Sequence, residues 1–294
     1  MKTILITGIT GFLGSALAHY YTQAGYKVAG LVRATSSYKR IEDILSKLEI
    51  CQINKDDDVA DSVARLEPHY IIHTACAYGR AGESLTDIYD SNVRLGLLLL
   101  DAAKRIDKRV TFLNTGTVLD KETNTYSMSK IFFSDIGAMQ TKQEGNKLQF
   151  INIALQHMYG PGDDISKFTT YVIKSCLTNV QKIDLTAGTQ KRDFIYLDDT
   201  VSAYDAIIKN SEKLGSTEEI EVGSGQAVQV REFAELTHKI CASSTKLNFG
   251  KIPYRDGESM HYEADTTKLR SLGWMPNYSL KEGLKKTVEK ETVQ

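Results

Sequence analysis

The stretch Thr3-Ile4-Leu5-Ile6-Thr7-Gly8-Ile9-Thr10-Gly11-Phe12-Leu13-Gly14 decides the fold of this chain. Its first five residues have the composition of a buried strand, and the pattern that follows predicts a helix from Phe12 to Gln23. The three glycines therefore fall on a strand-to-helix turn. Gly8 permits the tight turn, Gly11 lets a pyrophosphate approach the backbone, and Gly14 permits close packing. The stretch predicts a dinucleotide site at a helix N-terminus, and the alternative is a turn with a structural role alone.

Short β-type runs alternate with helical patterns through the first half of the chain. This alternation is typical of an α/β protein with a Rossmann doubly wound parallel sheet, covered by helices on both faces. The further strands are expected at Lys27 to Val32, Ile50 to Ile53, Tyr70 to His73, Val110 to Asn114 and Leu148 to Leu155. The further helices are expected at Tyr38 to Lys47, Val59 to Leu66, Ser84 to Ile106 and Tyr126 to Lys142.

The pattern changes after Tyr159-Gly160-Pro161-Gly162, where the elements become shorter. Helices are expected at Phe168 to Leu177, Thr200 to Asn210 and Val230 to Cys241. The sequence predicts a Rossmann domain that binds the dinucleotide over residues 1–158, rejoined by about 190–212, and a smaller C-terminal α/β substrate domain over residues 159–294. Open α/β sheets bind ligands at the carboxyl ends of their strands, so we expect the smaller domain there.

The composition excludes several kinds of partner. Of the 294 residues, 41% are hydrophobic, and 36 Lys and Arg against 37 Asp and Glu leave no net field to attract nucleic acid or a membrane. The four cysteines lack Cys-x-x-Cys spacing, and His69 and His73 lie roughly 13 Å apart on one expected strand, so no metal site is expected. No apolar run is long enough to span a membrane. The first residues imitate a secretory signal, but the spaced glycines favour a cytoplasmic protein.

The end of the second strand determines the choice of cofactor. Proteins that bind NAD carry an acidic residue there, whereas Val32 stands in that place and Arg33 follows. A guanidinium suits the 2′-phosphate of NADP, and the hydroxyl of Ser36 or Ser37 adds a contact, so the sequence favours NADPH. The alternative is that Arg33 is a solvated surface residue.

The segment Tyr126-Ser127-Met128-Ser129-Lys130 places a phenol and an ammonium on one face of the expected helix. At about 5 Å and an effective dielectric near 20, the positive charge stabilises a phenolate by roughly 3 kcal/mol, or about two pKa units. We therefore expect Lys130 to lower the pKa of the Tyr126 phenol to about 8. The alternative is an amphipathic surface pair.

These motifs resemble the extended short-chain dehydrogenases/reductases, the NAD-dependent epimerase/dehydratase family. The resemblance covers essentially the whole chain, through His73-Thr74-Ala75, Asn92, Tyr159-Gly160-Pro161-Gly162, Arg192-Asp193-Phe194-Ile195 and Arg255. It implies that Tyr126 is the general acid for a sugar keto oxygen, that Lys130 binds the nicotinamide ribose, and that Thr115 hydrogen-bonds the same oxygen. Thr117 is the substitute if the strand ends differently. The further cofactor contacts that it implies are Thr10, Phe12, Leu13, Ile53, Thr74, Ala75, Cys76 and Asn92.

The resemblance also implies a nucleotide-sugar site. Arg192 and Arg255 match positions that grip a nucleotide diphosphate, and the alternative for each is an ion pair with a carboxylate. The candidates for the sugar pocket are Tyr78, Arg80, Thr117 and His157. A lone tyrosine or histidine is as readily a structural residue.

Several segments resemble in particular the CDP-3,6-dideoxyhexose synthases, which make paratose and abequose. They are Ala77-Tyr78-Gly79-Arg80, Gln156-His157-Met158-Tyr159-Gly160, Gln190-Lys191-Arg192-Asp193-Phe194 and Glu221-Val222-Gly223-Ser224-Gly225. This resemblance implies an NADPH-dependent reductase of the 4-keto group of a nucleotide-activated deoxysugar, foremost CDP-4-keto-3,6-dideoxyglucose, for O-antigen or another surface polysaccharide. The 4,6-dehydratases carry Asp-Glu where Gly116-Thr117 stands, so dehydration is disfavoured.

Two alternatives stay open, namely an NAD(P)-dependent nucleotide-sugar 4-epimerase and a non-catalytic NADP-sensing binding protein. The family resemblance further implies a homodimer through the helices at Ser84 to Ile106 and Tyr126 to Lys142. Leu97 to Leu100 and Ile131 to Phe133 are expected to supply apolar contact between the subunits. The alternative for these side chains is packing against the sheet.

Overall fold

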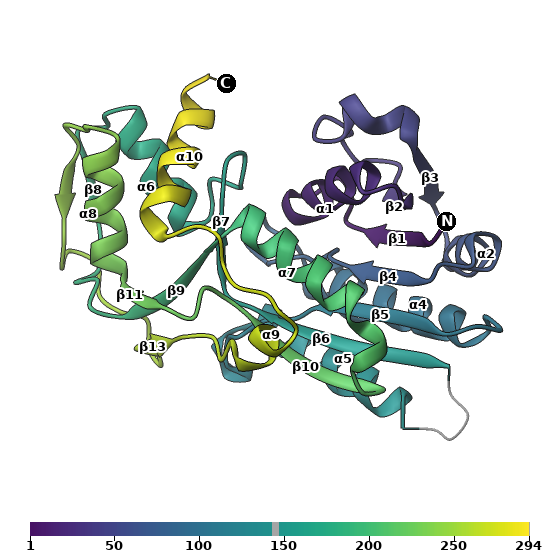
Figure 1. Ribbon diagram of the computed structural model, residues 1–294. Helices are drawn as coiled ribbons and strands as arrows, with labels where there is room; N and C mark the ends of the chain where they lie inside the picture. The colour runs from purple at the N-terminus through teal and green to yellow at the C-terminus, as the bar shows by residue number, and fades with distance from the viewer. Residues whose placement is uncertain (143–146, 294) are drawn as a thin grey trace. The chain divides into compact units, whose positions relative to one another are not determined.

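A computed structural model describes residues 1–142 and 147–293 (Figure 1). The chain divides into two compact units. Unit 1 consists of Met1–Ala154 and Tyr204–Ile220, and unit 2 of Leu155–Ala203 and Glu221–Gln294. We expected a boundary at residue 158 and a returning segment at about 190–212. The structure places the return later, because strand β10 (Thr217–Val222) adds to the sheet of unit 1.

Unit 1 is built on a seven-stranded parallel sheet in the order β10-β6-β5-β4-β1-β2-β3. Besides β10, its strands are β1 (Thr3–Thr7), β2 (Lys27–Arg33), β3 (Leu48–Ile53), β4 (Tyr70–His73), β5 (Val110–Thr115) and β6 (Leu148–Leu155). The central strands β1 and β4 are buried along their whole length, as strands covered on both faces are. The strand order reverses between β1 and β4, and the carboxyl ends at such a reversal are where doubly wound sheets bind ligands. The predicted Rossmann class is confirmed.

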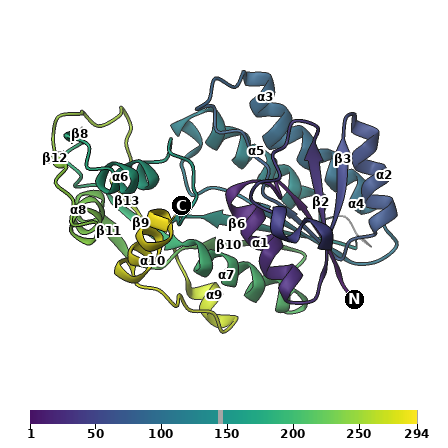
Figure 2. The ribbon, with the colours of Figure 1, turned by 90° about the horizontal axis from the view of Figure 1, so that it is seen from above.

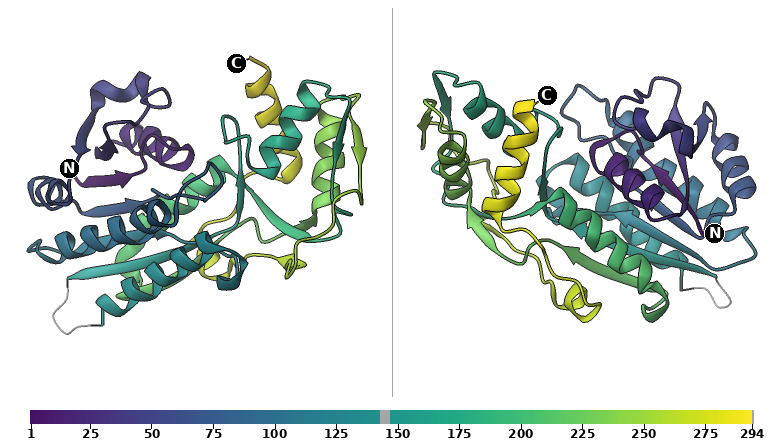
Figure 3. Two further views of the ribbon diagram at one scale, coloured as in Figure 1. Left: turned by 180° about the vertical axis from the view of Figure 1, so that it is seen from behind. Right: turned by 45° about the horizontal axis from the view of Figure 1, so that its top comes forward.

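Helices cover both faces of this sheet (Figures 2 and 3). On one face lie α1 (Phe12–Gln23) and the later turns of α7 (Leu197–Lys209), where the Tyr20 hydroxyl donates to the Asp205 carboxylate at 2.8 Å. On the other face lie α2 (Asp56–Leu66), α4 (Leu95–Lys104) and α5 (Thr125–Gln140), which share one apolar core with the strands. Leu99, Leu100 and Phe133 belong to this core, so the expectation that they supply contact between subunits is wrong, whereas Phe132 is exposed.

Two predicted helices have a different form. In place of a helix over 38–47, a 3₁₀ helix, η1, covers Glu42–Lys47, because the buried side chains of Ile41 and Ile44 are spaced by three, which suits three residues per turn. The helix expected over 84–106 consists of α3 (Leu85–Tyr89), a π-helical turn η2 (Asp90–Arg94) and α4. Further short 3₁₀ turns are η3 (Lys121–Thr123) and η4 (Ser211–Lys213).

Unit 2 has two small sheets. In the larger, β9 (Lys191–Tyr196) pairs with β7 (His157–Tyr159), β11 (Ala227–Gln229) and β13 (His261–Tyr262), and in the smaller β8 (Lys182–Asp184) pairs with β12 (Lys246–Asn248). Its helices are α6 (Phe168–Leu177), α8 (Val230–Ile240), α9 (Thr267–Ser271) and α10 (Leu280–Val293). Its core is aromatic, and the ring centres of Phe194 and Phe233 lie 4.4 Å apart. Over the described part of the chain, no helix combines the length and the apolar character that crossing a membrane requires.

Candidate active site

The glycine turn between β1 and α1 is a tight cradle. Gly8 has a φ of 66°, in the left-handed region that favours glycine, and the Gly11 amide donates to the Gly8 carbonyl at 2.8 Å. A Cβ on Gly14 would overlap the same carbonyl, so the helix packs directly on the turn. Gly11 is the N-cap residue of α1 and offers no side-chain cap, which leaves the first amides of the helix for an anion. This cradle fits a pyrophosphate.

The cradle is in contact with the end of β4. The Thr74 hydroxyl donates to the Thr7 carbonyl at 2.7 Å, and the Ala75 amide donates to the Thr7 hydroxyl at 3.2 Å. A Cβ on Gly8 would lie 2.8 Å from the Ala75 amide nitrogen. Of the other expected residues on the turn, Thr10 and Phe12 are partly exposed and Leu13 is buried.

Arg33 and Ile53 pair in register at the carboxyl ends of β2 and β3. The Arg33 side chain is exposed, and a turn holds Ser36 beside it. The Arg33 amide donates to the Ser36 hydroxyl at 3.1 Å, and the Ser36 amide donates to the Arg33 carbonyl at 3.0 Å. The Arg33 guanidinium lies near the Asp87 carboxylate. Hydrogen bonds from Ser84 lower the pKa of Asp87, and the charge of Arg33 lowers it further.

Tyr126 lies in the first turn of α5, among several of the residues expected at the site. The helix begins after Asn124, whose side-chain oxygen accepts the Ser127 amide at 2.9 Å. The Tyr126 phenol hydrogen-bonds the Thr117 hydroxyl. Its ring packs on that of Tyr78 with 4.9 Å between centroids, and the Arg80 guanidinium lies over the Tyr78 ring at 5.5 Å. Tyr78, Arg80 and Thr117 thus gather around the phenol.

Lys130 follows one turn later, with 1% of its surface exposed. Its ammonium has no hydrogen-bond partner among the residues that the structure describes. Burial lowers the pKa of Lys130, and Cys76 acts in the opposite direction. A buried cation without a partner is costly, and a polar ligand held at this place would supply the partner. Together with the open cradle of the glycine turn, this ammonium fits a dinucleotide.

Burial raises the pKa of the Tyr126 phenol, and Cys76 adds to this rise, while Thr117 and Arg80 act in the opposite direction. The expectation that the pKa of Tyr126 is lowered is therefore wrong. Withdrawal from water penalises the phenolate more than the Thr117 hydroxyl and the Arg80 guanidinium stabilise it. The effect of Cys76 on both Tyr126 and Lys130 places this thiol, next to Ala75, beside the pair.

Asn92 stands in the π-helical turn η2 and is completely buried. Its carboxamide accepts the Ala77 amide at 2.8 Å and donates to the Ala77 carbonyl and the Ser129 hydroxyl, both at 2.9 Å. These bonds join the loop after β4 to α5, one residue before Lys130. Asn92 thus supports this loop and α5, and its expected contact with the cofactor stays a prediction.

Thr115, at the end of β5, has its hydroxyl oxygen 2.8 Å from the phenol oxygen of Tyr204 on α7. The Thr117 hydroxyl instead accepts the Leu119 amide at 3.2 Å and bonds to Tyr126. The two threonines thus belong to different pairs at one site. Tyr204 carries no local sequence signal, because its partner is 89 residues away, and sequence reasoning missed it.

Unit 2 holds the other substrate candidates. Arg192 is buried, forms an ion pair with Glu258, and has its guanidinium 5.0 Å from the centre of the Tyr262 ring. Arg255 is exposed in the same turn as Glu258, whose amide donates to the Arg255 carbonyl at 3.0 Å. His157 packs against the Tyr262 ring at 6.2 Å between centroids. The two arginines thus converge on one short loop.

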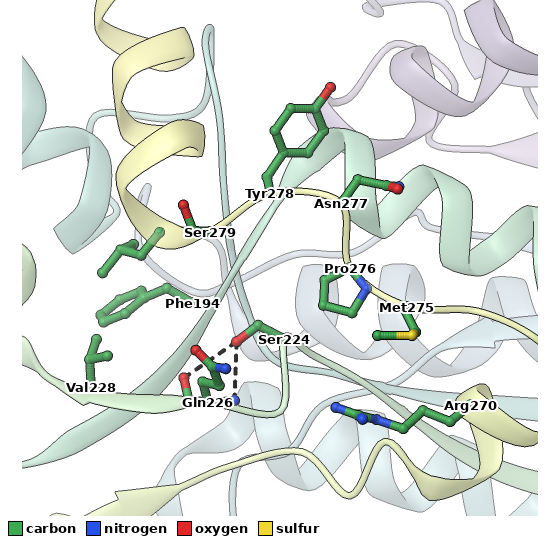
Figure 4. Close-up of a pocket in the computed structure, with 11 residues that line it drawn as sticks. Phe194, Ser224, Gln226, Val228, Arg270, Met275, Pro276, Asn277, Tyr278 and Ser279 are labelled. Carbon is green, nitrogen blue, oxygen red and sulfur yellow. Dashed lines mark hydrogen bonds between the residues drawn. The ribbon is translucent and has the colours of Figure 1, made fainter.

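A pocket of about 310 Å³ in unit 2 is lined by Phe194, by the turn after β10 and by residues 275–280 (Figure 4). The buried Asp193 carboxylate holds this turn, since it accepts the Ser224 hydroxyl at 2.5 Å and the Gly225 amide at 2.8 Å. Sequence reasoning contained Asp193 only as part of a motif and gave it no role. None of the expected sugar-pocket residues lines this pocket.

The family profile of the NAD dependent epimerase/dehydratase family matches residues 4–223. The chain belongs to this family. Among curated members, the CDP-abequose synthase of Salmonella muenchen is 34% identical over 97% of this chain and 96% of its own length, and that of Salmonella typhimurium is 31% identical over 98% and 97%. The crystal structure of the UDP-glucose 4-epimerase of Thermotoga maritima with UDP-glucose covers 99% of this chain and 100% of that chain, with a TM-score of 0.85 at 21% identity. This last likeness concerns the fold alone. The predicted family membership is confirmed.

Proposed function

We propose that this protein is an NADPH-dependent reductase of the 4-keto group of a nucleotide-activated deoxysugar, with CDP-4-keto-3,6-dideoxyglucose as the favoured substrate. The product is CDP-abequose or CDP-paratose, made in the cytoplasm for O-antigen or another surface polysaccharide. The observation that carries the proposal is the buried, unpartnered ammonium of Lys130, one turn after the Tyr126 phenol and beside the loop that contacts the glycine cradle. The sugar and the base are taken from the relatives named CDP-abequose synthase.

In this proposal unit 1 binds the cofactor. The amides of the turn from Gly8 to Gly14 hold the pyrophosphate, Lys130 hydrogen-bonds the ribose, and the exposed Arg33 with Ser36 holds the 2′-phosphate. When bound, NADPH supplies the hydride that turns the ketone carbon into an alcohol carbon and is left as NADP⁺.

The proton comes from Tyr126. As the carbonyl π bond breaks, the phenol gives its proton to the ketone oxygen and a new O–H bond forms. Thr115 donates a hydrogen bond to the same oxygen, where negative charge develops. Thr117, bonded to the phenol, and Tyr78, whose ring packs against the Tyr126 ring at a tilt of 33°, orient the donor. A tyrosine phenol with its ordinary pKa of about 10 is already protonated at neutral pH, and burial favours the same state, which is the one that a general acid needs.

Unit 2 is proposed to bind the nucleotide sugar. Arg192 and Arg255 grip the diphosphate, for which Arg192 exchanges the Glu258 carboxylate for phosphate oxygens. His157 is proposed to face the sugar. Tyr78, Arg80 and Thr117 of unit 1 are likewise proposed to contact the sugar, and Tyr78 and Thr117 in addition orient the Tyr126 phenol.

The test is the loss of NADPH absorbance with CDP-4-keto-3,6-dideoxyglucose, which should be stoichiometric with the alcohol formed. Tyr126→Phe should still bind NADPH, measured by quenching of its fluorescence, and should lose turnover by about 10²–10⁴-fold because the proton donor is gone. The matched control is Tyr89→Phe, which removes an exposed phenol on α3 and should keep full activity.

Two results would replace the proposal. Interconversion of two closed-shell nucleotide sugars without net loss of NADPH would identify a 4-epimerase. Binding of NADPH by the unaltered protein, without turnover of any 4-keto nucleotide sugar, would identify a sensing protein. Equal rates with NADH would overturn the choice of NADPH and leave the reduction standing.

A further inference from the structure

Tyr204 is a completely buried residue of α7 in unit 1. Its phenol oxygen lies 2.8 Å from the Thr115 hydroxyl oxygen, and Tyr204 is one of the groups that raise the pKa of Tyr126. A second phenol therefore lies behind the site, in contact with the threonine that is expected to bind the reacting oxygen. The role proposed for Tyr126 leaves this phenol unused.

The hydrogen bond between Tyr204 and Thr115 has a preferred direction. Burial raises the pKa of the Tyr204 phenol, so the phenol keeps its proton at neutral pH. Within the described residues, Thr115 is the side-chain partner of this phenol, and a buried donor left without an acceptor is costly. Tyr204 therefore donates, and the Thr115 oxygen accepts.

This direction decides what the Thr115 proton can do. A hydroxyl has one proton and two lone pairs, and here one lone pair is taken by Tyr204. The proton of Thr115 must then point away from Tyr204, and Thr115 is partly exposed, which leaves room for an acceptor from outside the protein. Thr117 has no such freedom, because its hydroxyl bonds both the Leu119 amide and Tyr126.

We propose that Tyr204 is a positioning residue that acts through Thr115. By donating to the Thr115 oxygen, it holds the threonine hydroxyl as a hydrogen-bond donor toward the substrate, aimed at the oxygen on which negative charge develops. This inference rests on the proposed ketone reduction. Tyr204 itself touches neither the substrate nor the cofactor in this arrangement.

The test is a double-mutant cycle on the holoenzyme with NADPH and CDP-4-keto-3,6-dideoxyglucose. Thr115→Val should lower kcat by about 10²-fold and Tyr204→Phe by about 10-fold, each with little change in KM, since the hydrogen bond matters most in the transition state. In the Thr115→Val background, Tyr204→Phe should change kcat by less than about twofold, because the group through which it acts is absent. Thr115→Ser, which keeps the hydroxyl, should restore both the activity and its dependence on Tyr204.

Equal losses from Tyr204→Phe in both backgrounds would overturn the inference and leave Tyr204 a structural residue, as would a raised KM at unchanged kcat. The melting temperature and NADPH binding of each variant report whether the fold is intact. If Tyr204→Phe does not fold, Tyr204→Met, whose flexible side chain fills irregular space, completes the same cycle. A protein with no reductase activity at all would contradict the proposed function, whereas an active protein with an additive cycle contradicts this inference alone.

Discussion

Tyr126, Lys130 and His73 are ionisable side chains that the fold buries. Burial favours the uncharged form of each, so it raises the pKa of Tyr126 and lowers the pKa of Lys130 and of His73. His73 is completely buried, its Nδ1 lies 2.8 Å from the Thr7 hydroxyl oxygen, and its Nε2 has no partner within the described part of the chain. Burial lowers the pKa of His73 well below 6.5, and Lys130 acts in the same direction. The His73 imidazole at the end of β4 is therefore neutral at pH 7.

His73 should make the stability of the protein depend on pH. At pH values between the lowered pKa of His73 in the folded protein and 6.5, this histidine is protonated in the unfolded chain and neutral in the folded protein. The free energy of unfolding should therefore fall as the pH falls below about 6.5, by up to about 1.4 kcal/mol per pH unit. Urea unfolding between about pH 5 and 7 should show a shallower dependence for His73→Asn than for His261→Asn, which alters an exposed histidine. Identical slopes would refute this assignment.

Arg33 should govern the choice between the two dinucleotides. Arg33→Ala should raise the KM for NADPH by about 10-fold or more and leave that for NADH nearly unchanged, because only NADPH carries the 2′-phosphate. Arg105→Ala, which removes another exposed guanidinium, is the control for the loss of one surface charge. A parallel rise for both cofactors would mean that Arg33 does not read the 2′-phosphate.

At the scale of the element, the glycine turn before α1 contains one glycine on which stability should depend and another on which cofactor binding should depend. A Cβ on Gly14 would overlap the Gly8 carbonyl, whereas one on Gly11 would lie 3.1 Å from it. Gly14→Ala should therefore lower the free energy of unfolding by about 2 kcal/mol or more. Gly11→Ala should change stability far less and instead weaken NADPH binding, since its methyl group faces the phosphates. Thermal unfolding and NADPH titration of both variants check this, and equal melting temperatures would contradict it.

Elements with a strong local pattern could be predicted, and those that depend on distant contacts could not. The bounds of β1, β4 and α1 follow from apolar runs and the glycine turn and agree with the structure. The π-helical turn η2 could not be predicted from the sequence, because it depends on the hydrogen bonds of Asn92 to Ala77 and Ser129. In the candidate site, motif residues were named in advance, whereas Tyr204 and the raised pKa of Tyr126 depend on tertiary burial that no local pattern records.

At the scale of the whole molecule, α5 carries an apolar stripe that faces solvent. Met128, Phe132 and Met139 are 49%, 49% and 64% exposed and lie on one face of the helix, at spacings of four and seven. We propose that this stripe, with α4 beside it, forms the homodimer contact. The contact then uses side chains other than the buried Leu99, Leu100 and Phe133.

Phe132→Glu should convert the dimer to a monomer, because a carboxylate cannot be buried there without a partner. Light scattering at micromolar concentration measures the mass directly. Ile252→Glu, at a side chain 47% exposed in unit 2, is the matched control and should leave the dimer intact. A monomeric unaltered protein, or a dimer that persists in Phe132→Glu, would count against this contact.

The late return of Tyr204–Ile220 to unit 1 has a consequence for synthesis on the ribosome. Most of the first unit emerges early, yet strand β10 arrives only after the whole of residues 155–203 has been translated. During that interval β6 is a bare edge, open to pairing with other nascent chains. A chain that terminates before residue 217 should thus aggregate or be degraded by proteases, and should not fold into a truncated protein that still binds the dinucleotide.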